Sequence, residues 1–236
     1  IYTKDGQTYD VCETETFTIS PKPITIGLMN PNQRITKPYD GGTTLPSGLE
    51  LGPKDTVEHD RVNLIPGNLE FAQKDVKLKD DGTVDSIPIR VKAGMVCLEG
   101  DDADNYTVKL DGDDNIDGLS GTITKRTIVV TPKSSDKVNL TYGDDVAGKL
   151  ASEYTTNINE LPTTCVAPTI EGSMALTKGE TEASAPYDAG EYTVALGSLS
   201  VGSNYRLELA SGTHTWTIGK KTIKFLLTCE READYG

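Results

Sequence analysis

The sequence predicts a mainly β protein of two small β-rich domains in tandem, and three observations support this prediction. One short phrase of alternating apolar and polar residues occurs three times; its isoleucines Ile19, Ile123 and Ile218 align, which gives intervals of 104 and 95 residues. Each interval is about the length of one small domain. Turn signals rich in Gly, Asp and Asn recur roughly every eight to twelve residues. Between them, apolar and polar residues alternate with period two, the pattern of strands that bury one face.

The repeated phrase marks the seams between domains. Its three copies are TFTISPKPITI from Thr16, SGTITKRTIVV from Ser120 and TWTIGKKTIKF from Thr215. No flexible Gly/Ser linker lies at these seams, so we expect neighbouring domains to be joined with limited swing. The predicted segments are a leading strand segment (residues 1–20), a first domain (21–124), a second domain (125–220) and the first strand of an incomplete third repeat (221–236).

In the first domain, Ile87–Val91 and Tyr106–Leu110 are predicted strands. The second run alternates Tyr106, Val108 and Leu110 with polar residues, so these three side chains are expected to share a buried face. The turn signals of this domain are Asp40-Gly41-Gly42, Pro66-Gly67-Asn68, Asp80-Asp81-Gly82 and Asp111-Gly112.

The second domain has clearer strands. They are predicted at 192–196, 205–209 and 214–218, and in the last of these Trp216 and Ile218 are expected to face inward. Apolar residues fall at helical offsets only over 145–154, where Gly148 weakens the pattern, so at most one short helix is expected in this domain. These patterns do not separate an immunoglobulin-like sandwich from a grasp-like sheet, because both consist of short alternating strands.

Several phrases resemble known bacterial repeats. After the first seam, Lys37-Pro38-Tyr39-Asp40-Gly41-Gly42-Thr43-Thr44 resembles the opening of a YDG-type repeat, and Asp102-Ala103-Asp104-Asn105-Tyr106-Thr107-Val108 resembles its closing phrase. After the second seam, the matching phrases resemble the related MBG, or mirror β-grasp, repeats; they are Thr141-Tyr142-Gly143-Asp144, Ala189-Gly190-Glu191-Tyr192-Thr193-Val194 and Ser203-Asn204-Tyr205.

The resemblance implies bacterial immunoglobulin-like modules of long exported proteins, with no catalytic or ligand-binding residues in the family pattern. Gly41 and Gly143, near the motif tyrosines, would permit a positive φ that ends the first strand. Asn105 and Asn204 are expected to bond their own backbone in a turn and to present the following tyrosine to the core edge.

Charge and cysteine spacing exclude several classes of partner. The net charge of −13 argues against nucleic acid and anionic membrane surfaces, which require basic patches, and it suits an extracellular protein. No apolar run approaches the ~20 residues that span a bilayer, so no membrane insertion is expected in this segment. The four cysteines lie too far apart for a zinc site. A Cys12–Cys97 disulfide and free thiols both remain open.

One segment fits the first half of a calcium loop. Asp113, Asn115 and Asp117, followed by Gly118, match D-x-N-x-D-G, in which alternate side chains turn inward onto Ca²⁺. The twelfth position, where an EF-hand has Glu, is Thr124. An acidic β-turn is therefore the favoured interpretation, with Ca²⁺ as the alternative and no other cofactor expected.

The preferred functional hypothesis is a non-catalytic spacer of a bacterial cell-surface or secreted protein, such as an adhesin stalk, whose partners are neighbouring repeats of the same chain. The sequence has only two histidines, His59 and His214, and no nucleophile or phosphate-loop motif. The alternatives are a module that binds a carbohydrate or a host surface protein, and an accessory scaffold of a large secreted hydrolase. An exposed Trp216 in a groove would favour sugar binding. The LPTTC segment, 161–165, lacks the glycine and apolar tail of a cell-wall sorting signal and is predicted to be a loop.

Overall fold

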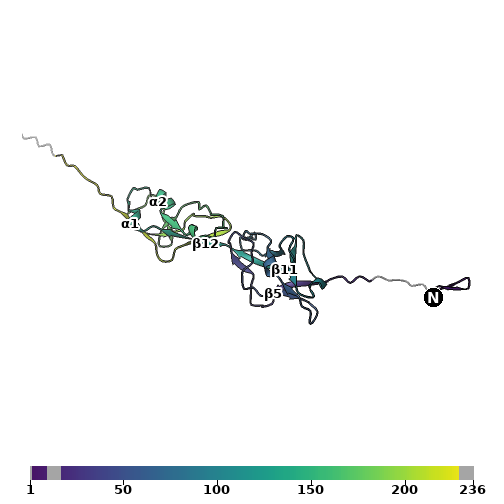
Figure 1. The fold of residues 1–236 in the computed structure, drawn as a ribbon. Coiled ribbons are helices and arrows are strands. Elements are labelled where there is room, and N and C mark those ends of the chain that lie inside the picture. The colour runs from purple at the N-terminus through teal and green to yellow at the C-terminus, as the bar shows by residue number, and fades with distance from the viewer. Residues whose placement is uncertain (1, 10–16, 229–236) are drawn as a thin grey trace, which may run out of the picture. The chain divides into compact units, whose positions relative to one another are not determined.

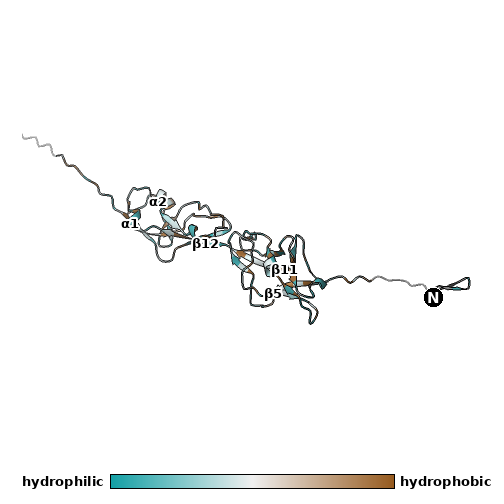
Figure 2. Ribbon diagram, viewed as in Figure 1, coloured by the Kyte–Doolittle hydropathy of each residue, from teal (hydrophilic) through white to brown (hydrophobic). Residues whose placement is uncertain are grey.

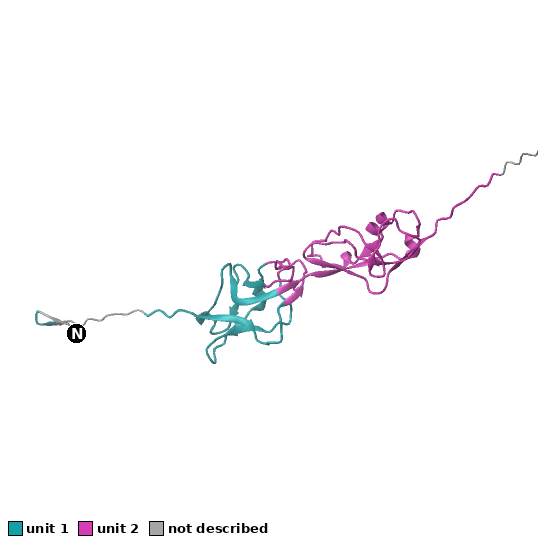
Figure 3. Ribbon diagram, turned by 180° about the vertical axis from the view of Figure 1, so that it is seen from behind, with its two compact units in different colours: residues 1–35, 44–72, 87–121 teal, residues 36–43, 73–86, 122–236 magenta. Residues whose placement is uncertain are grey.

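The computed structural model describes residues 2–9 and 17–228 of the 236-residue chain. It is mainly β, with 37% of residues in strands and 9% in helices, which confirms the prediction of a mainly β protein. Figure 1 shows the elements along the chain, and Figure 3 colours two compact units. Unit 1 comprises residues 1–35, 44–72 and 87–121, and unit 2 comprises residues 36–43, 73–86 and 122–236. The domain boundaries inferred from the seams stay predictions.

Unit 1 consists of short strands in several small sheets. One sheet has the order β10-β3-β5, and another places β8 between β7 and the first part of β11. The strands are β1 (Tyr2–Lys4), β2 (Gln7–Tyr9), β3 (Lys22–Leu28), β5 (Leu51–Lys54), β6 (Asn63–Leu64), β7 (Leu69–Phe71), β8 (Ile87–Val91), β9 (Leu98–Glu99), β10 (Tyr106–Val108) and β11 (Asn115–Thr124, whose last three residues belong to unit 2); two 3-10 turns are η1 (Pro66–Asn68) and η2 (Ala103–Asn105).

Alternation explains which side chains of unit 1 are buried. Ile24 and Ile26 of β3 and Ile87 and Ile89 of β8 are spaced two residues apart, and all four are buried. Figure 2 shows hydrophobic stretches along strands of each unit. The predicted strand over 87–91 is confirmed. The prediction for 106–110 was wrong at its end, because β10 stops at 108 and Leu110 is 48% exposed where the chain enters an acidic turn.

Unit 2 has two sheets and two short helices. The sheet orders are β14-β12-β18 and β13-β19-β17-β15-β16, and β4 pairs with the end of β11. The elements are β4 (Thr36–Pro38), β12 (Arg126–Pro132), α1 (Ser135–Val138), β13 (Leu140–Thr141), α2 (Val146–Ser152), β14 (Tyr154–Thr156), η3 (Ile158–Glu160), β15 (Ala175–Lys178), β16 (Thr181–Glu182), β17 (Gly190–Ala195), β18 (Tyr205–Leu209) and β19 (Thr215–Gly219). The predicted strands at 205–209 and, within a residue or two at each end, at 192–196 and 214–218 are therefore confirmed.

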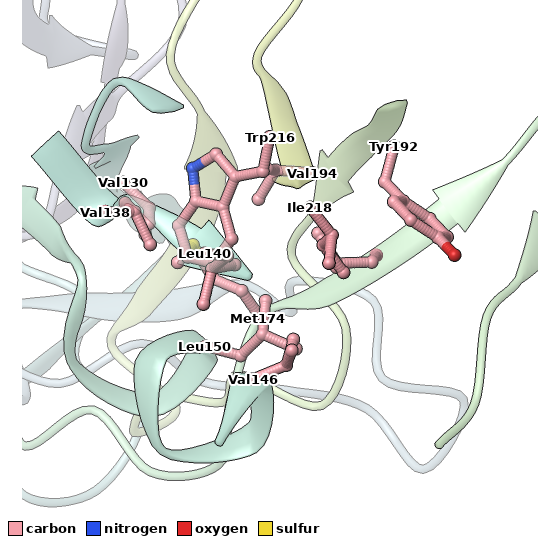
Figure 4. Packing of buried hydrophobic residues seen from close by; sticks show 11 residues of the cluster. Val130, Val138, Leu140, Val146, Leu150, Met174, Tyr192, Val194, Trp216 and Ile218 are labelled. Carbon is pink, nitrogen blue, oxygen red and sulfur yellow. The ribbon is translucent and has the colours of Figure 1, made fainter. Parts of the chain in front are cut away.

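The core of unit 2 draws side chains from both sheets and from both helices, so it has the layered arrangement expected of sheets that bury one face. Trp216 and Ile218 of β19 face inward, as predicted, and Figure 4 shows the indole close to Leu140 with Val130 and Val138 beside it. The indole N–H donates to the Lys133 carbonyl at 2.8 Å, so the one polar atom of this ring is satisfied.

The helix prediction was partly correct. Helix α2 lies inside the predicted span and is capped by Asp145, whose side chain accepts a hydrogen bond from the Gly148 N–H. The expectation of at most one helix was wrong, because the single turn α1 precedes β13. This turn has no amphipathic signature; it ends at Asn139 in a left-handed conformation and is held by burial of Val138.

Two parallel strand pairs have the same register in both halves of the chain. β3 runs parallel to β10 with Lys22 opposite Tyr106, and β12 runs parallel to β18 with Arg126 opposite Tyr205. The short strands β4 and β13 likewise lie parallel to β11 and β19, directly before Tyr39 and Tyr142. The two motif tyrosines therefore occupy equivalent positions in the strand pairings.

Candidate functional site

The strongest candidate site lies in unit 2, where the loop after β4 carries Tyr39, Asp40 and Gly41. Tyr39 is 1% exposed and packs edge-to-face on Tyr205, with ring centroids 5.4 Å apart and an interplanar angle of 77°. Its N–H donates to the Thr124 carbonyl at 2.8 Å, and its own carbonyl accepts from Arg126 Nε. The ring and both backbone groups of this tyrosine are thus used in packing within the unit.

Asp40 organises the loop. Its Oδ1 accepts from Lys37 Nζ at 2.8 Å and from the Gly42 N–H at 2.9 Å. Burial raises the pKa of this carboxyl, but these two hydrogen bonds outweigh burial, so the pKa lies below its ordinary value. The Asp40 carbonyl accepts from the Thr164 hydroxyl. The loop is therefore held by hydrogen bonds to its own Asp40 carboxylate and by the hydrogen bond from Thr164.

Gly41 is needed for two reasons. Its φ of +78° lies in the left-handed region that favours glycine, as predicted. A Cβ at this position would also lie 2.0 Å from the Thr164 carbonyl oxygen and 2.9 Å from the Cys165 nitrogen. The backbone of the loop therefore approaches the 164–165 backbone more closely than any side chain permits.

Asn204 makes a contact that the sequence did not indicate. Its Oδ1 accepts from the Val76 N–H and its Nδ2 donates to Asp75 Oδ1, both at 2.8 Å. The expectation that this side chain bonds its own turn was wrong, because the backbone turn is closed instead by the Tyr205 N–H on the Gly202 carbonyl. The amide is consequently available to bind a segment 128 residues away in sequence.

Tyr39 and Tyr205 stay neutral at ordinary pH. Burial and the Cys165 thiol raise the pKa of Tyr205 to about 12, and its hydroxyl donates to the Val166 carbonyl at 2.6 Å. Burial and the Asp75 carboxylate raise the pKa of Tyr39. A neutral phenol that packs against protein atoms holds segments together and has no nucleophilic character.

A pocket of about 680 Å³ lies beside Tyr39 and Tyr205 in unit 2. It is lined by Tyr39 and Tyr205, by residues of the loops 166–171 and 200–204, and by the charged residues Lys74, Asp75 and Glu171. Its aromatic residues are buried ones, so the pocket offers polar loops and no exposed aromatic platform.

Of the predicted calcium residues, Asp113 lies in a tight hairpin turn, and Asn115 and Asp117 lie at the start of β11. Asp113 has a φ of +42°, and the Asp111 N–H donates to the Asn115 carbonyl at 2.7 Å, which closes the turn before β11. Asn115 Oδ1 is buried and accepts no hydrogen bond from the described residues. In residues 2–9 and 17–228 no three His, Cys, Asp or Glu side chains gather as a metal site would require. Calcium binding by Asp113, Asn115 and Asp117 stays a prediction.

The two histidines and the described cysteines do not come together in one site. His59 is exposed beside Glu58, and His214 Nε2 lies 3.1 Å from the Ala210 carbonyl. Cys97 is a buried thiol and Cys165 a half-buried one. The disulfide alternative involves Cys12, which lies outside the described residues. Thr164 and Cys165 lie in the predicted loop and approach Asp40 and Gly41, which are far away in sequence. No local sequence signal marks them.

Comparison with known proteins identifies one segment. Residues 20–115 match the family model described as the YDG domain, which is the repeat type that the motifs of this segment predicted. No curated protein matches the chain. No solved structure matches it either. Within the described part of the chain, no helix has the length and apolar character needed to cross a membrane. The resemblance of the second half to MBG repeats stays a prediction.

Proposed function

We propose that this chain, which matches the YDG domain over residues 20–115, is a non-catalytic structural spacer of a bacterial cell-surface or secreted protein, such as an adhesin stalk. Its Tyr-Asp-Gly loop acts as a fastening element that joins segments of the polypeptide. Neighbouring repeats of the same chain are its partners. The proposal concerns load and spacing, with no chemical step.

One observation carries the proposal: each residue of the motif is engaged with protein atoms. Tyr39 packs on Tyr205, Asp40 binds Lys37 and the loop backbone, and Gly41 lies against the 164–165 backbone. A motif that recognised a soluble ligand would keep at least one of these groups exposed for it. The high negative charge also supports a soluble extracellular setting.

The carbohydrate-binding alternative receives less support. Sugar recognition favours an exposed aromatic face, and the one tryptophan of the chain, Trp216, is 1% exposed in the core of unit 2. Its indole N–H is already bonded to Lys133. The tyrosines beside the 680 Å³ pocket are buried as well.

The test combines scattering, ligand screening and localisation. Small-angle X-ray scattering compares the full wild-type chain with Gly41→Ala, and Gly42→Ala serves as the matched control. A spacer fastened by this loop gives one conformer for wild type and control, and a broader ensemble for Gly41→Ala. A glycan and host-protein array is expected to give no hits, and antibody labelling of intact source cells is expected to detect the chain. Micromolar binding on the array, or identical scattering for all three proteins, would contradict the proposal.

A further inference from the structure

We propose that unit 1 carries a tyrosine socket, formed by Ser20, Lys22, Asn105 and Tyr106, that binds the tyrosine loop of another YDG-type segment. This inference rests on the proposed spacer function, because it names a partner that would dock on unit 1. It is drawn from a comparison of two equivalent places in this chain, one of which holds such a loop.

The equivalence follows from strand register. In the parallel pair of unit 1, Tyr106 lies opposite Lys22, and in that of unit 2, Tyr205 lies opposite Arg126. Each tyrosine follows an asparagine and each cation begins the first strand after a seam. The corresponding pairs are Tyr106 with Tyr205, Lys22 with Arg126, Asn105 with Asn204 and Ser20 with Thr124.

In unit 2 all four of these positions hold the loop after β4 or the nearby segment 75–76. The Thr124 carbonyl accepts the Tyr39 N–H, and Arg126 Nε donates to the Tyr39 carbonyl. Tyr205 receives the Tyr39 ring, and Asn204 binds residues 75 and 76 through both ends of its amide. These contacts define the chemistry of an occupied socket.

In unit 1 the same four positions line a pocket of about 280 Å³. Asn105 is exposed, and no hydrogen bond of its side chain is recorded among the described residues. Lys22 Nζ donates to the Asp55 carbonyl at 2.6 Å, but an ammonium group has three donors and two remain for a further acceptor. The Tyr106 hydroxyl donates to Asp60 and accepts from the Val57 N–H, and its ring, which is 7% exposed, forms part of the pocket wall.

The seam isoleucine supports an aromatic or apolar partner at this place. Ile19 lines the pocket and is 95% exposed, whereas the aligned Ile123 is fully buried. Covering one such side chain is worth about 1.5–3 kcal/mol. A partner that supplies a ring, a backbone N–H for Ser20 and a carbonyl for Lys22 would cover Ile19 and satisfy these two residues. A tyrosine followed by Asp-Gly supplies all three, as Tyr39 does in unit 2.

The test uses a peptide of residues 35–44 of this chain, Ile-Thr-Lys-Pro-Tyr-Asp-Gly-Gly-Thr-Thr, titrated into the ¹⁵N-labelled full-length chain. The expected result is saturable chemical-shift change at the amides of Lys22, Asn105 and Tyr106, with a Kd on the order of 1 mM because few contacts form. A peptide with alanine in place of its tyrosine is expected to bind at least about tenfold more weakly. Lys22→Ala should weaken binding about threefold or more, because it removes the donor equivalent to Arg126, whereas Thr107→Ala, an exposed control on β10, should leave it unchanged.

Several outcomes would overturn the socket. These are no shift change up to about 5 mM peptide, equal binding of the alanine peptide, or shifts confined to other surfaces. Shifts at these amides that depend only on protein concentration and persist in Tyr142→Ala would show self-association without a tyrosine loop, which also contradicts the proposal. A failed titration together with a destabilised Gly41→Ala variant would reject the socket alone. Hits on the glycan array would reject the spacer function without affecting the titration.

Discussion

Replacement of Gly41 by alanine tests whether the Tyr-Asp-Gly loop stabilises unit 2. The substitution adds one methyl group to a residue with φ of +78°, at a place where the Cβ would lie 2.0 Å from the Thr164 carbonyl oxygen and 2.5 Å from its carbon. These are backbone atoms and have no rotamer that relieves the contact. The loop must therefore withdraw, or the 164–165 backbone must move.

The magnitude has two parts. A left-handed conformation costs an L-residue about 1–2 kcal/mol. Forcing a methyl group into a packed site costs about 1–3 kcal/mol more. The free energy of unfolding of unit 2 should therefore fall by about 2–5 kcal/mol. Gly42→Ala is the control, because its Cβ would meet only Asp40 Oδ1, at an ordinary 3.6 Å, and it should change stability by less than about 0.5 kcal/mol.

The assay is urea unfolding followed by tryptophan fluorescence. The single tryptophan, Trp216, lies in the core of unit 2 and reports the unfolding of that unit. With a slope of about 1–3 kcal/mol per molar urea, Gly41→Ala should lower the midpoint by about 1–2 M. If Gly41→Ala and Gly42→Ala unfold at the same urea concentration, the close approach of the loop contributes nothing and the argument for a fastening element fails.

Three further predictions concern the same units. Asn204→Ala should destabilise unit 2 by about 1–3 kcal/mol, because the buried Val76 loses the acceptor for its N–H, whereas Asn105→Ala should be nearly neutral in the same urea assay. The folded-state pKa of Tyr205, about 12, exceeds its ordinary 10.0, so the stability that this group contributes is fully present below pH 10 and is lost as pH rises toward 12. The urea midpoint of Tyr205→Phe should therefore decline less steeply with alkaline pH than that of wild type. Equal slopes for the two proteins would contradict this. Burial raises the pKa of the Cys97 thiol, so its reaction with a thiol reagent, followed by mass spectrometry, should require denaturant; rapid labelling in native buffer would refute it.

The strands could be predicted from the sequence because burial of one face leaves a period-two record. Tyr192 and Val194 of β17 and Trp216 and Ile218 of β19 are buried as their alternation indicated. The positive φ of Gly41 was likewise a local requirement that the Tyr-Asp-Gly phrase reveals. Local patterns of this kind carry the fold class.

The distant partners of the motif could not be predicted, because Thr164 and Tyr205 lie more than 100 residues away in sequence. Nothing near Thr164 marks it as the residue that binds the Asp40 carbonyl, 124 positions away. Asn204 follows the usual pattern of a turn asparagine, yet its amide binds residues 75 and 76. The exposure of Leu110 has a similar cause: the acidic turn that follows it, and not the alternation that precedes it, sets the end of β10.

The three copies of the seam phrase show that the same local sequence does not determine its own burial. Ile123 and Ile218 are buried in paired strands: β11 pairs with β4 at Ile123, and β19 pairs with β13 and β17 at Ile218. Ile19 has the same neighbours in sequence but lies in no described strand and is 95% exposed. Ile223, in the first-strand half of the phrase, is exposed, while the aligned Ile128 of β12 is fully buried. Each exposed isoleucine forgoes about 1.5–3 kcal/mol of hydrophobic stabilisation. The phrase is thus a strand only where partner strands flank it, and its exposed copies are the positions at which another repeat would gain most by packing.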